Sequence, residues 1–172
     1  MKGLNELPES YYEKFANKKV TIKPFNPETR KLADVYIKSL NEILGEEIEV
    51  VLRGSTLFGI AGKGEIEYGV YPGEDNWQNV FDKLKVKYGD VQNTDNNYAR
   101  FNDVSGDTEI EIIMMKGRDA EVDKKLTAYL LEHKDLLKEY EGIKYQNCGS
   151  KKDYMIAKDK FFRRVIEMIP ED

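Results

Sequence analysis

The chain has little of the two residue types on which many catalytic and metal sites depend. Its 172 residues include one cysteine, Cys148, and one histidine, His133. A lone cysteine cannot close an intramolecular disulfide, which indicates a reducing compartment. One histidine and one cysteine are too few for a zinc site or a Cys/His nucleophile pair. Because His133 lies near the end of a predicted helix, it fits a capping role better than that of a base.

The chain also lacks segments that target a membrane or bind long nucleic acids. No stretch approaches the roughly 20 consecutive apolar residues that span a bilayer, and the N-terminal MKGLNELPESYYEKF has no apolar core of the signal-peptide type. The formal net charge is −5, and no polybasic block interrupts the mixture of signs. We therefore expect a soluble, cytoplasmic protein with neither a membrane nor a long nucleic acid as partner.

What the chain does have is enough apolar surface for one folded domain. Hydrophobic residues make up 40% of the sequence, which at this length supplies a core without a disulfide or a structural metal. We expect residues 1–19 to form an N-terminal arm or short helix. Residues 20–172 are predicted to form a single domain.

The order of the predicted elements indicates an α+β fold. Period-two alternation predicts strands over residues 20–25, 47–53, 65–71, 98–103 and 108–115. Helical spacing and capping residues predict helices over residues 26–45, 74–89, 119–133, 134–146 and 151–169. Strands first and helices last predict a small mixed sheet flanked by helices, with a helical C-terminal half.

The segment VLRGSTLFGIAGKGEIEYGV, residues 51–70, combines two features of a nucleotide site. A strand that ends in Gly54-Ser55 and leads into a short helix presents backbone N–H groups and a hydroxyl, which suit a phosphate. Glu65 and Glu67 lie two apart on the next strand, so their carboxylates project from the same face. Such carboxylates repel unless a cation lies between them, which makes the pair a candidate Mg²⁺ or Mn²⁺ site.

An ordinary interpretation accounts for the same residues. Acidic residues at alternate positions are typical of the solvent face of an amphipathic strand, and EIEV at 47–50 and EIEI at 109–112 repeat the pattern. Gly-Ser is more often a turn than a phosphate loop. Spacing alone therefore favours a plain turn and strand.

As a whole, RGSTLFGIAGKGEIEYGV resembles the signature of the nucleotidyltransferase superfamily, in which Gly-Ser and a further glycine precede a strand with two carboxylates. More specifically, GST, the following glycine and alanine, and Lys63 resemble the GrpB-like family. So do YLLEHKDLLKEYEGIKYQ and KKDYMIAKDKFFRRVI in the C-terminal half, and the match runs from about residue 20 to 168. The resemblance implies a nucleotidyltransferase-like fold with a metal-dependent nucleotide site.

The chain departs from the family pattern at several positions. Glu65 and Glu67 stand where the family has aspartates. Arg53 stands where it usually has histidine, and Glu111 where it often has a histidine on a later strand. An alternative register aligns Glu67 with the first acidic position and Gly69 with the second. The register through Glu65 and Glu67 keeps the alternation of acidic and apolar residues in EIEYGV.

The resemblance also implies roles for further residues. In the superfamily a third carboxylate on a neighbouring strand acts as a base or completes a second metal position, and Glu111 is our candidate. The phosphate-binding candidates are Gly54, Ser55, Lys63 and Lys158. The other candidates for the cleft are Arg53, Glu109, Lys144 and Tyr154. Ordinary surface or packing roles are alternatives for these side chains.

We therefore expect a metal-dependent nucleotidyltransferase that moves a nucleotidyl group from an NTP to the hydroxyl of an unknown small-molecule or protein acceptor. The alternative is a nucleotide- or coenzyme-binding module of the same fold with weak or no catalysis, which the replacement of both aspartates favours. A weaker interpretation is an interaction domain that uses its mixed-charge C-terminal helices. The sequence identifies neither the nucleotide, the acceptor nor the oligomeric state.

Overall fold

The structure, a computed structural model, describes residues 7–170. They form two compact units. The sheet unit comprises residues 25–59 and 64–123, and the helical unit comprises residues 7–24, 60–63 and 124–170. The single domain over residues 20–172 stays a prediction. Residues 1–6 of the predicted arm, and residues 171–172, lie outside the described residues.

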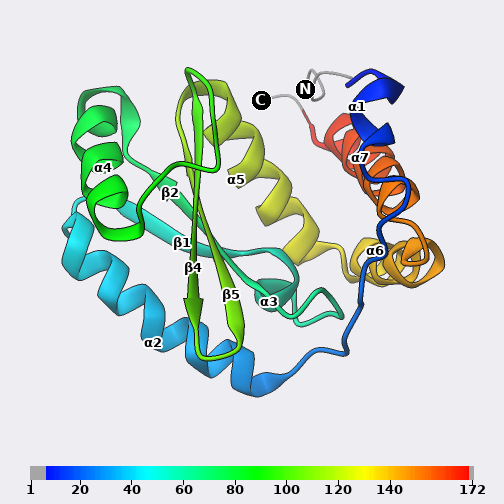
Figure 1. Cartoon of the computed structure of the whole chain (residues 1–172). Coiled ribbons are helices and arrows are strands. Elements are labelled where there is room, and N and C mark those ends of the chain that lie inside the picture. The colour runs from blue at the N-terminus through cyan, green and yellow to red at the C-terminus, as the bar shows by residue number, and fades with distance from the viewer. Residues whose placement is uncertain (1–6, 171–172) are drawn as a thin grey trace. The chain divides into compact units, whose positions relative to one another are not determined.

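The sheet unit is built on a five-stranded mixed sheet (Figure 1). Its strands are β1 (Glu49–Arg53), β2 (Ile66–Tyr71), β3 (Asn93–Thr94), β4 (Tyr98–Ser105) and β5 (Thr108–Met115), in the spatial order β1-β2-β5-β4-β3. The central pair β2–β5 is parallel and the other pairs are antiparallel. The predicted α+β fold with a small mixed sheet is confirmed. The short strand β3 was not predicted.

Two helices cover one face of this sheet and close the main core. Helix α2 (Pro27–Leu44) begins at Asn26, whose side chain accepts a hydrogen bond from the Glu28 N–H at 3.0 Å. Helix α4 (Gly73–Tyr88) lies beside it (Figure 1). Their apolar faces pack against the inward side chains of the strands, among them Tyr68, whose buried hydroxyl donates to the Ala33 carbonyl at 2.7 Å.

The opposite face of the sheet is apolar at one end and charged at the other. Tyr71, Ile113 and Met115 form a small cluster that Val51, Tyr98 and Ala120 extend. Ala120 lies in the first turns of α5 (Gly117–Glu132), which starts in the sheet unit. Towards the other end of β2 and β5, this face carries charged residues in place of apolar ones.

The helical unit contains α1 (Glu9–Glu13), the remainder of α5, α6 (Lys134–Asn147) and α7 (Lys151–Met168). Tyr140 of α6 stacks on Phe161 of α7 with ring centroids 5.1 Å apart. The predicted helical C-terminal half is therefore confirmed. The predicted strand over residues 20–25 is instead one isolated bridge between Lys23 and Gly62, because the apolar alternation there is short and Pro24 interrupts it.

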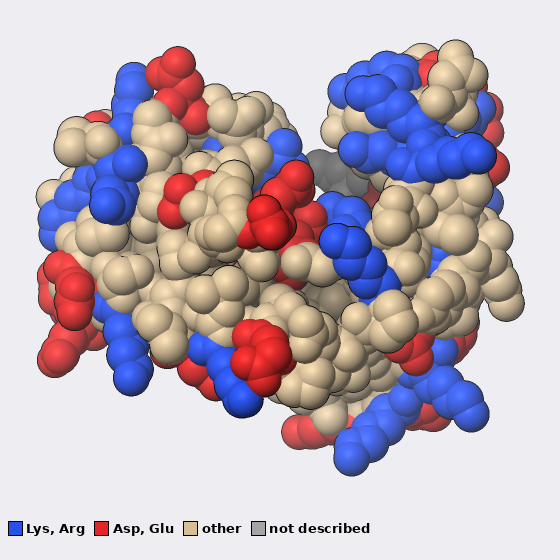
Figure 2. Space-filling view, turned by 60° about the horizontal axis from the view of Figure 1, so that its bottom comes forward, with Lys and Arg blue, Asp and Glu red and all other residues tan. Residues whose placement is uncertain are grey.

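Charged side chains of both signs are scattered among uncharged residues over the face drawn in Figure 2, with a group of Lys and Arg at the upper right. This agrees with the mixed charge pattern of the sequence. Within residues 7–170 there is no helix with the length and hydropathy that crossing a bilayer requires.

Candidate metal centre

Strand pairing brings three glutamates together on the charged face. Glu67 of β2 lies directly opposite Glu111 of β5, and Glu65 immediately precedes β2. One carboxylate oxygen from each of the three lies within 4.8 Å of the other two, and all three residues are partly buried. The structure thus brings together the three acidic residues singled out from the sequence. Their role as metal ligands stays a prediction.

The spacing suits a hard divalent cation. Mg²⁺ binds oxygen ligands at about 2.0–2.1 Å, so ligands on opposite sides of the ion are about 4.2 Å apart. Oxygens within 4.8 Å of one another lie near such positions, and small side-chain rotations would bring them to coordination distance. A glutamate has one more rotatable bond than an aspartate, which makes these rotations easier.

Gly54 stands directly against this cluster. Its φ is +69°, in the region that favours glycine, and a Cβ atom there would lie 2.7 Å from Glu67 Oε2. The backbone at the end of β1 therefore lies so close to the Glu67 carboxylate that only a residue without a side chain fits there. Ser55 follows in α3 (Gly54–Phe58), a helix of 5 residues. Because α3 is so short, its dipole adds little, and the phosphate-binding roles of Gly54 and Ser55 stay predictions.

Thr56 holds the backbone at Glu65, just before β2, by a hydrogen bond. Its buried hydroxyl, with a residue exposure of 5%, donates to the Glu65 carbonyl at 3.0 Å. This bond ties α3 to the backbone that carries the first carboxylate. Thr56 belongs to the GST segment, but it was not among the candidate site residues, since a threonine next to Gly-Ser has no chemical signature of its own.

Arg53 of β1 is the direct neighbour of Glu67 in the antiparallel β1–β2 pair. Its Nη2 is 2.5 Å from Asp123 Oδ1, and the Tyr71 hydroxyl donates to Asp123 Oδ2 at 2.5 Å. Burial by itself lowers the pKa of Arg53, but the Asp123 and Glu67 carboxylates outweigh burial and raise that pKa above its ordinary value. Burial and the Asp123 charge raise the pKa of Tyr71, which keeps its proton as a donor.

A second arginine approaches from the other side. Arg100 of β4 places its Nη1 3.8 Å from Glu111 Oε1. Among the described residues, the Nε atoms of Arg53 and Arg100 are buried without a hydrogen-bond partner. Two guanidiniums therefore flank the three carboxylates, one beyond β2 and one beyond β5. Of this framework the sequence had indicated only Arg53; Arg100, Tyr71 and Asp123 were missed.

Glu109 lies on the same face of β5 as Glu111, opposite Val104, but it is exposed and outside the three-carboxylate cluster. It was the alternative candidate for the third carboxylate. Glu111, and not Glu109, has the position opposite Glu67.

The remaining candidates belong to the helical unit. Lys144 is 1% exposed, and its Nζ donates to the Ala61 carbonyl at 2.7 Å and lies 4.2 Å from the centre of the Tyr140 ring. Tyr154 is buried, Lys63 is exposed, and Lys158 Nζ lies 5.9 Å from the centre of the Phe162 ring. The two contacts of Lys144 lie within the helical unit, and the ligand-binding roles of all four residues stay predictions.

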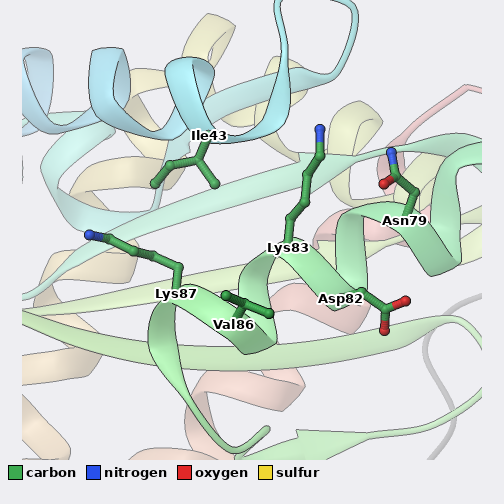
Figure 3. A pocket seen from close by; sticks show the side chains of 6 residues that line it. All are labelled: Ile43, Asn79, Asp82, Lys83, Val86 and Lys87. Carbon is green, nitrogen blue, oxygen red and sulfur yellow. The ribbon is translucent and has the colours of Figure 1, made fainter.

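An open pocket on the sheet unit lies away from these residues. Figure 3 shows its lining, which comes from α2 and α4: Ile43, Asn79, Asp82, Lys83, Val86 and Lys87. Lys83 Nζ donates to the Leu44 carbonyl at 3.0 Å, which links the two helices. Because α2 and α4 cover the other face of the sheet, this pocket contains none of the acidic cluster.

Comparison with known proteins gives similarity in structure only. No family model and no curated protein matches the chain. Among solved structures, a cytoplasmic RNA terminal U-transferase aligns with TM-score 0.43 and 13% identity over 81% of this chain and 46% of its own. The Cid1 poly(U) polymerase with Mg and 3′-dATP aligns with TM-score 0.44 and 11% identity over 87% and 52%.

Cid1 in complex with the UTP analogue UMPNPP aligns with TM-score 0.39 and 11% identity, over 87% of this chain and 50% of that one. The chain thus spans about half the length of the solved structures that it resembles. At this level of similarity, the chemistry of the chain follows only from its own residues.

Proposed function

We propose that the sheet unit binds a nucleoside triphosphate through a divalent cation and transfers its nucleotidyl group to a hydroxyl of an acceptor. The observation that carries this proposal is the convergence of Glu65, Glu67 and Glu111, whose oxygens lie within 4.8 Å of one another. The resemblance of residues 51–70 to the nucleotidyltransferase signature, and of the chain to the GrpB-like family, supports the same chemistry.

In this proposal each residue has a defined task. Glu65 and Glu67 would hold Mg²⁺ or Mn²⁺, which when bound neutralises phosphate charge and polarises the α-phosphate. The backbone of Gly54 and the Ser55 hydroxyl would hold phosphate oxygens beside Glu67. The acceptor oxygen forms a bond to the α-phosphorus, the bond from that phosphorus to the bridging oxygen breaks, and pyrophosphate leaves. The hydroxyl proton passes to the Glu111 carboxylate.

A second function, nucleotide binding without turnover, is favoured by one observation. Both ligand positions on the acidic strand carry glutamate where the signature has aspartate. The extra methylene would hold a cation farther from the strand than an aspartate does, which makes the geometry for transfer less favourable. Binding that raises thermal stability without release of pyrophosphate would identify this function.

The test is a thermal unfolding series with a panel of NTPs in Mg²⁺ or Mn²⁺. A ligand present at 100 times its Kd stabilises the folded state by about 2.7 kcal/mol. We expect the ligand-dependent rise in Tm to disappear in the double variant Glu65→Ala/Glu67→Ala. The matched control is Glu46→Ala/Glu47→Ala, which removes the same charge from an exposed turn before β1. An unchanged Tm across the panel for the unmodified chain would refute the proposal.

A further inference from the structure

The charged face of the sheet carries Arg100, an arginine that has no role in the nucleotidyl transfer proposed above. Arg100 lies in β4, whose backbone pairs with β5 at Ile113 and with β3 at Asn93. The main chain at Arg100 is thus held from both sides. Ile113 in turn pairs with Gly69, two residues beyond Glu67. Because direct partners share a face of the sheet, Arg100 projects from the face that carries the glutamates.

The contact between Arg100 and Glu111 is an ion pair without a hydrogen bond. Its 3.8 Å separation exceeds the 2.7–3.2 Å of an N–H···O bond. The Arg100 side chain is 35% exposed, so part of the guanidinium reaches solvent, while its Nε is buried without a partner. The Arg100 guanidinium is therefore held near Glu111 by charge. Its terminal N–H groups can still donate hydrogen bonds to an anionic ligand.

Arg100 is the positive charge that a second divalent ion would meet on this face. Its Nη1 lies 3.8 Å from Glu111 Oε1. The other arginine, Arg53, has its own carboxylate partner, Asp123, at 2.5 Å. A second ion beside Glu111 would therefore be repelled by the Arg100 guanidinium, whereas an ion between Glu65 and Glu67 lies on another strand.

We propose that Arg100 takes the place of a second metal cation. The centre binds one divalent ion, and the Arg100 guanidinium supplies the other positive charge that the ligand's phosphates contact. This inference rests on the proposed function. A planar guanidinium with several N–H donors matches phosphate geometry, which suits Arg100 to this role better than a lysine.

The first measurement is Mn²⁺ titration of the full chain, with free Mn²⁺ followed by its EPR signal. We expect one bound ion per chain. In Arg100→Gln the loss of a positive charge a few ångströms from the ion should tighten Mn²⁺ binding on the order of tenfold. The control Lys87→Gln removes the same charge from an exposed position on α4, the helix over the opposite face. It should leave Mn²⁺ binding unchanged.

The second measurement is the binding of inorganic triphosphate to the chain saturated with Mn²⁺. In R100Q we expect triphosphate affinity to fall on the order of tenfold, although Mn²⁺ binds more tightly. Opposite changes for the cation and the anion distinguish a ligand-binding arginine from a merely structural one. Arg100→Lys keeps the charge without the planar fork, so we expect unchanged Mn²⁺ affinity with several-fold weaker triphosphate binding. R100K keeps the test decisive if R100Q does not fold.

The outcomes separate this inference from the function on which it rests. Two Mn²⁺ ions of similar affinity in the unmodified chain, or an R100Q variant that behaves like K87Q, would overturn the role of Arg100. If Mn²⁺ binding is at the same time lost in E65A/E67A, the metal centre stands and the arginine inference alone falls. Absence of Mn²⁺ binding to the unmodified chain would overturn both.

Discussion

Replacement of Gly54 by alanine tests whether the metal centre depends on the close approach of β1. The new Cβ would lie 2.7 Å from Glu67 Oε2 and 2.8 Å from its Cδ, whereas ordinary contacts begin near 3.4 Å. The carboxylate must therefore move by about 0.7 Å or more, a displacement larger than the roughly 0.2 Å tolerance of metal–ligand distances. Because the end of a side chain can rotate away, the clash itself costs little stability.

The cost in stability comes mainly from the backbone. Gly54 has φ +69°, and an alanine in this region loses about 1–2 kcal/mol. For a chain of this size that corresponds to a fall in Tm of about 2–8 °C. Gly59 provides a matched control, since its φ is +67° and a Cβ there would meet nothing within 4 Å. Without metal, Gly54→Ala and Gly59→Ala should therefore unfold at similarly lowered temperatures.

The rise in Tm on adding Mn²⁺ should differ between G54A and G59A. With Mn²⁺ at about 100 times the Kd of the unmodified chain, binding adds about 2.7 kcal/mol. A tenfold loss of affinity, the lower end of the range for disturbed ligand supports, leaves about 1.4 kcal/mol. We expect G59A to keep the full Mn²⁺-dependent rise in Tm and G54A to lose half of it or more. A full rise in G54A, or an equal loss in both variants, would refute the reasoning.

Two further predictions concern the helical unit. Lys144→Ala removes a buried stem and the donor to the Ala61 carbonyl. The free energy of unfolding should therefore fall by about 2–4 kcal/mol in urea denaturation, and unchanged stability would contradict a packing role. Burial, together with its hydrogen bond to Asp159, raises the pKa of Tyr12 from 10.0 to about 12. The unfolded state thus loses this proton first, so stability should fall as pH rises from about 10 to 12. Tyr12→Phe should reduce that fall in urea titrations at pH 9 and 11; an unaltered fall would show that Tyr12 is not its source.

Local signals were sufficient for most elements of the fold. Helix α2 starts after Asn26 and ends at Gly45, as its caps predict, because capping is decided by a few neighbouring residues. Strand β3 has only 2 residues, both exposed, and so produces no periodicity to detect. The bridge at Lys23 likewise depends on a partner far along the chain, Gly62, which no local pattern indicates.

In the candidate site, too, local sequence predicts some of the neighbours and the tertiary fold decides the others. Glu65 and Glu67 share a face because they are two apart on a strand, which sequence alone establishes. That Glu111 joins them follows from the parallel β2–β5 pair, and the sequence supplied it only through a family resemblance. Arg100 gains its place from the order of strands, in which β4 is the neighbour of β5. Asp123 reaches Arg53 from a helix, and nothing in its local sequence marks that contact.

The parallel β2–β5 pair has a kinetic consequence. Glu67 and Glu111 lie directly opposite each other, yet α4, β3 and β4 intervene between them along the chain. The loop-closure entropy of this pairing must be overcome before the carboxylates meet, so we expect the acidic cluster to assemble late in folding. A cation bound there stabilises contacts that the transition state has not yet made. It should therefore lengthen the lifetime of the folded state by slowing unfolding, while the refolding rate stays the same.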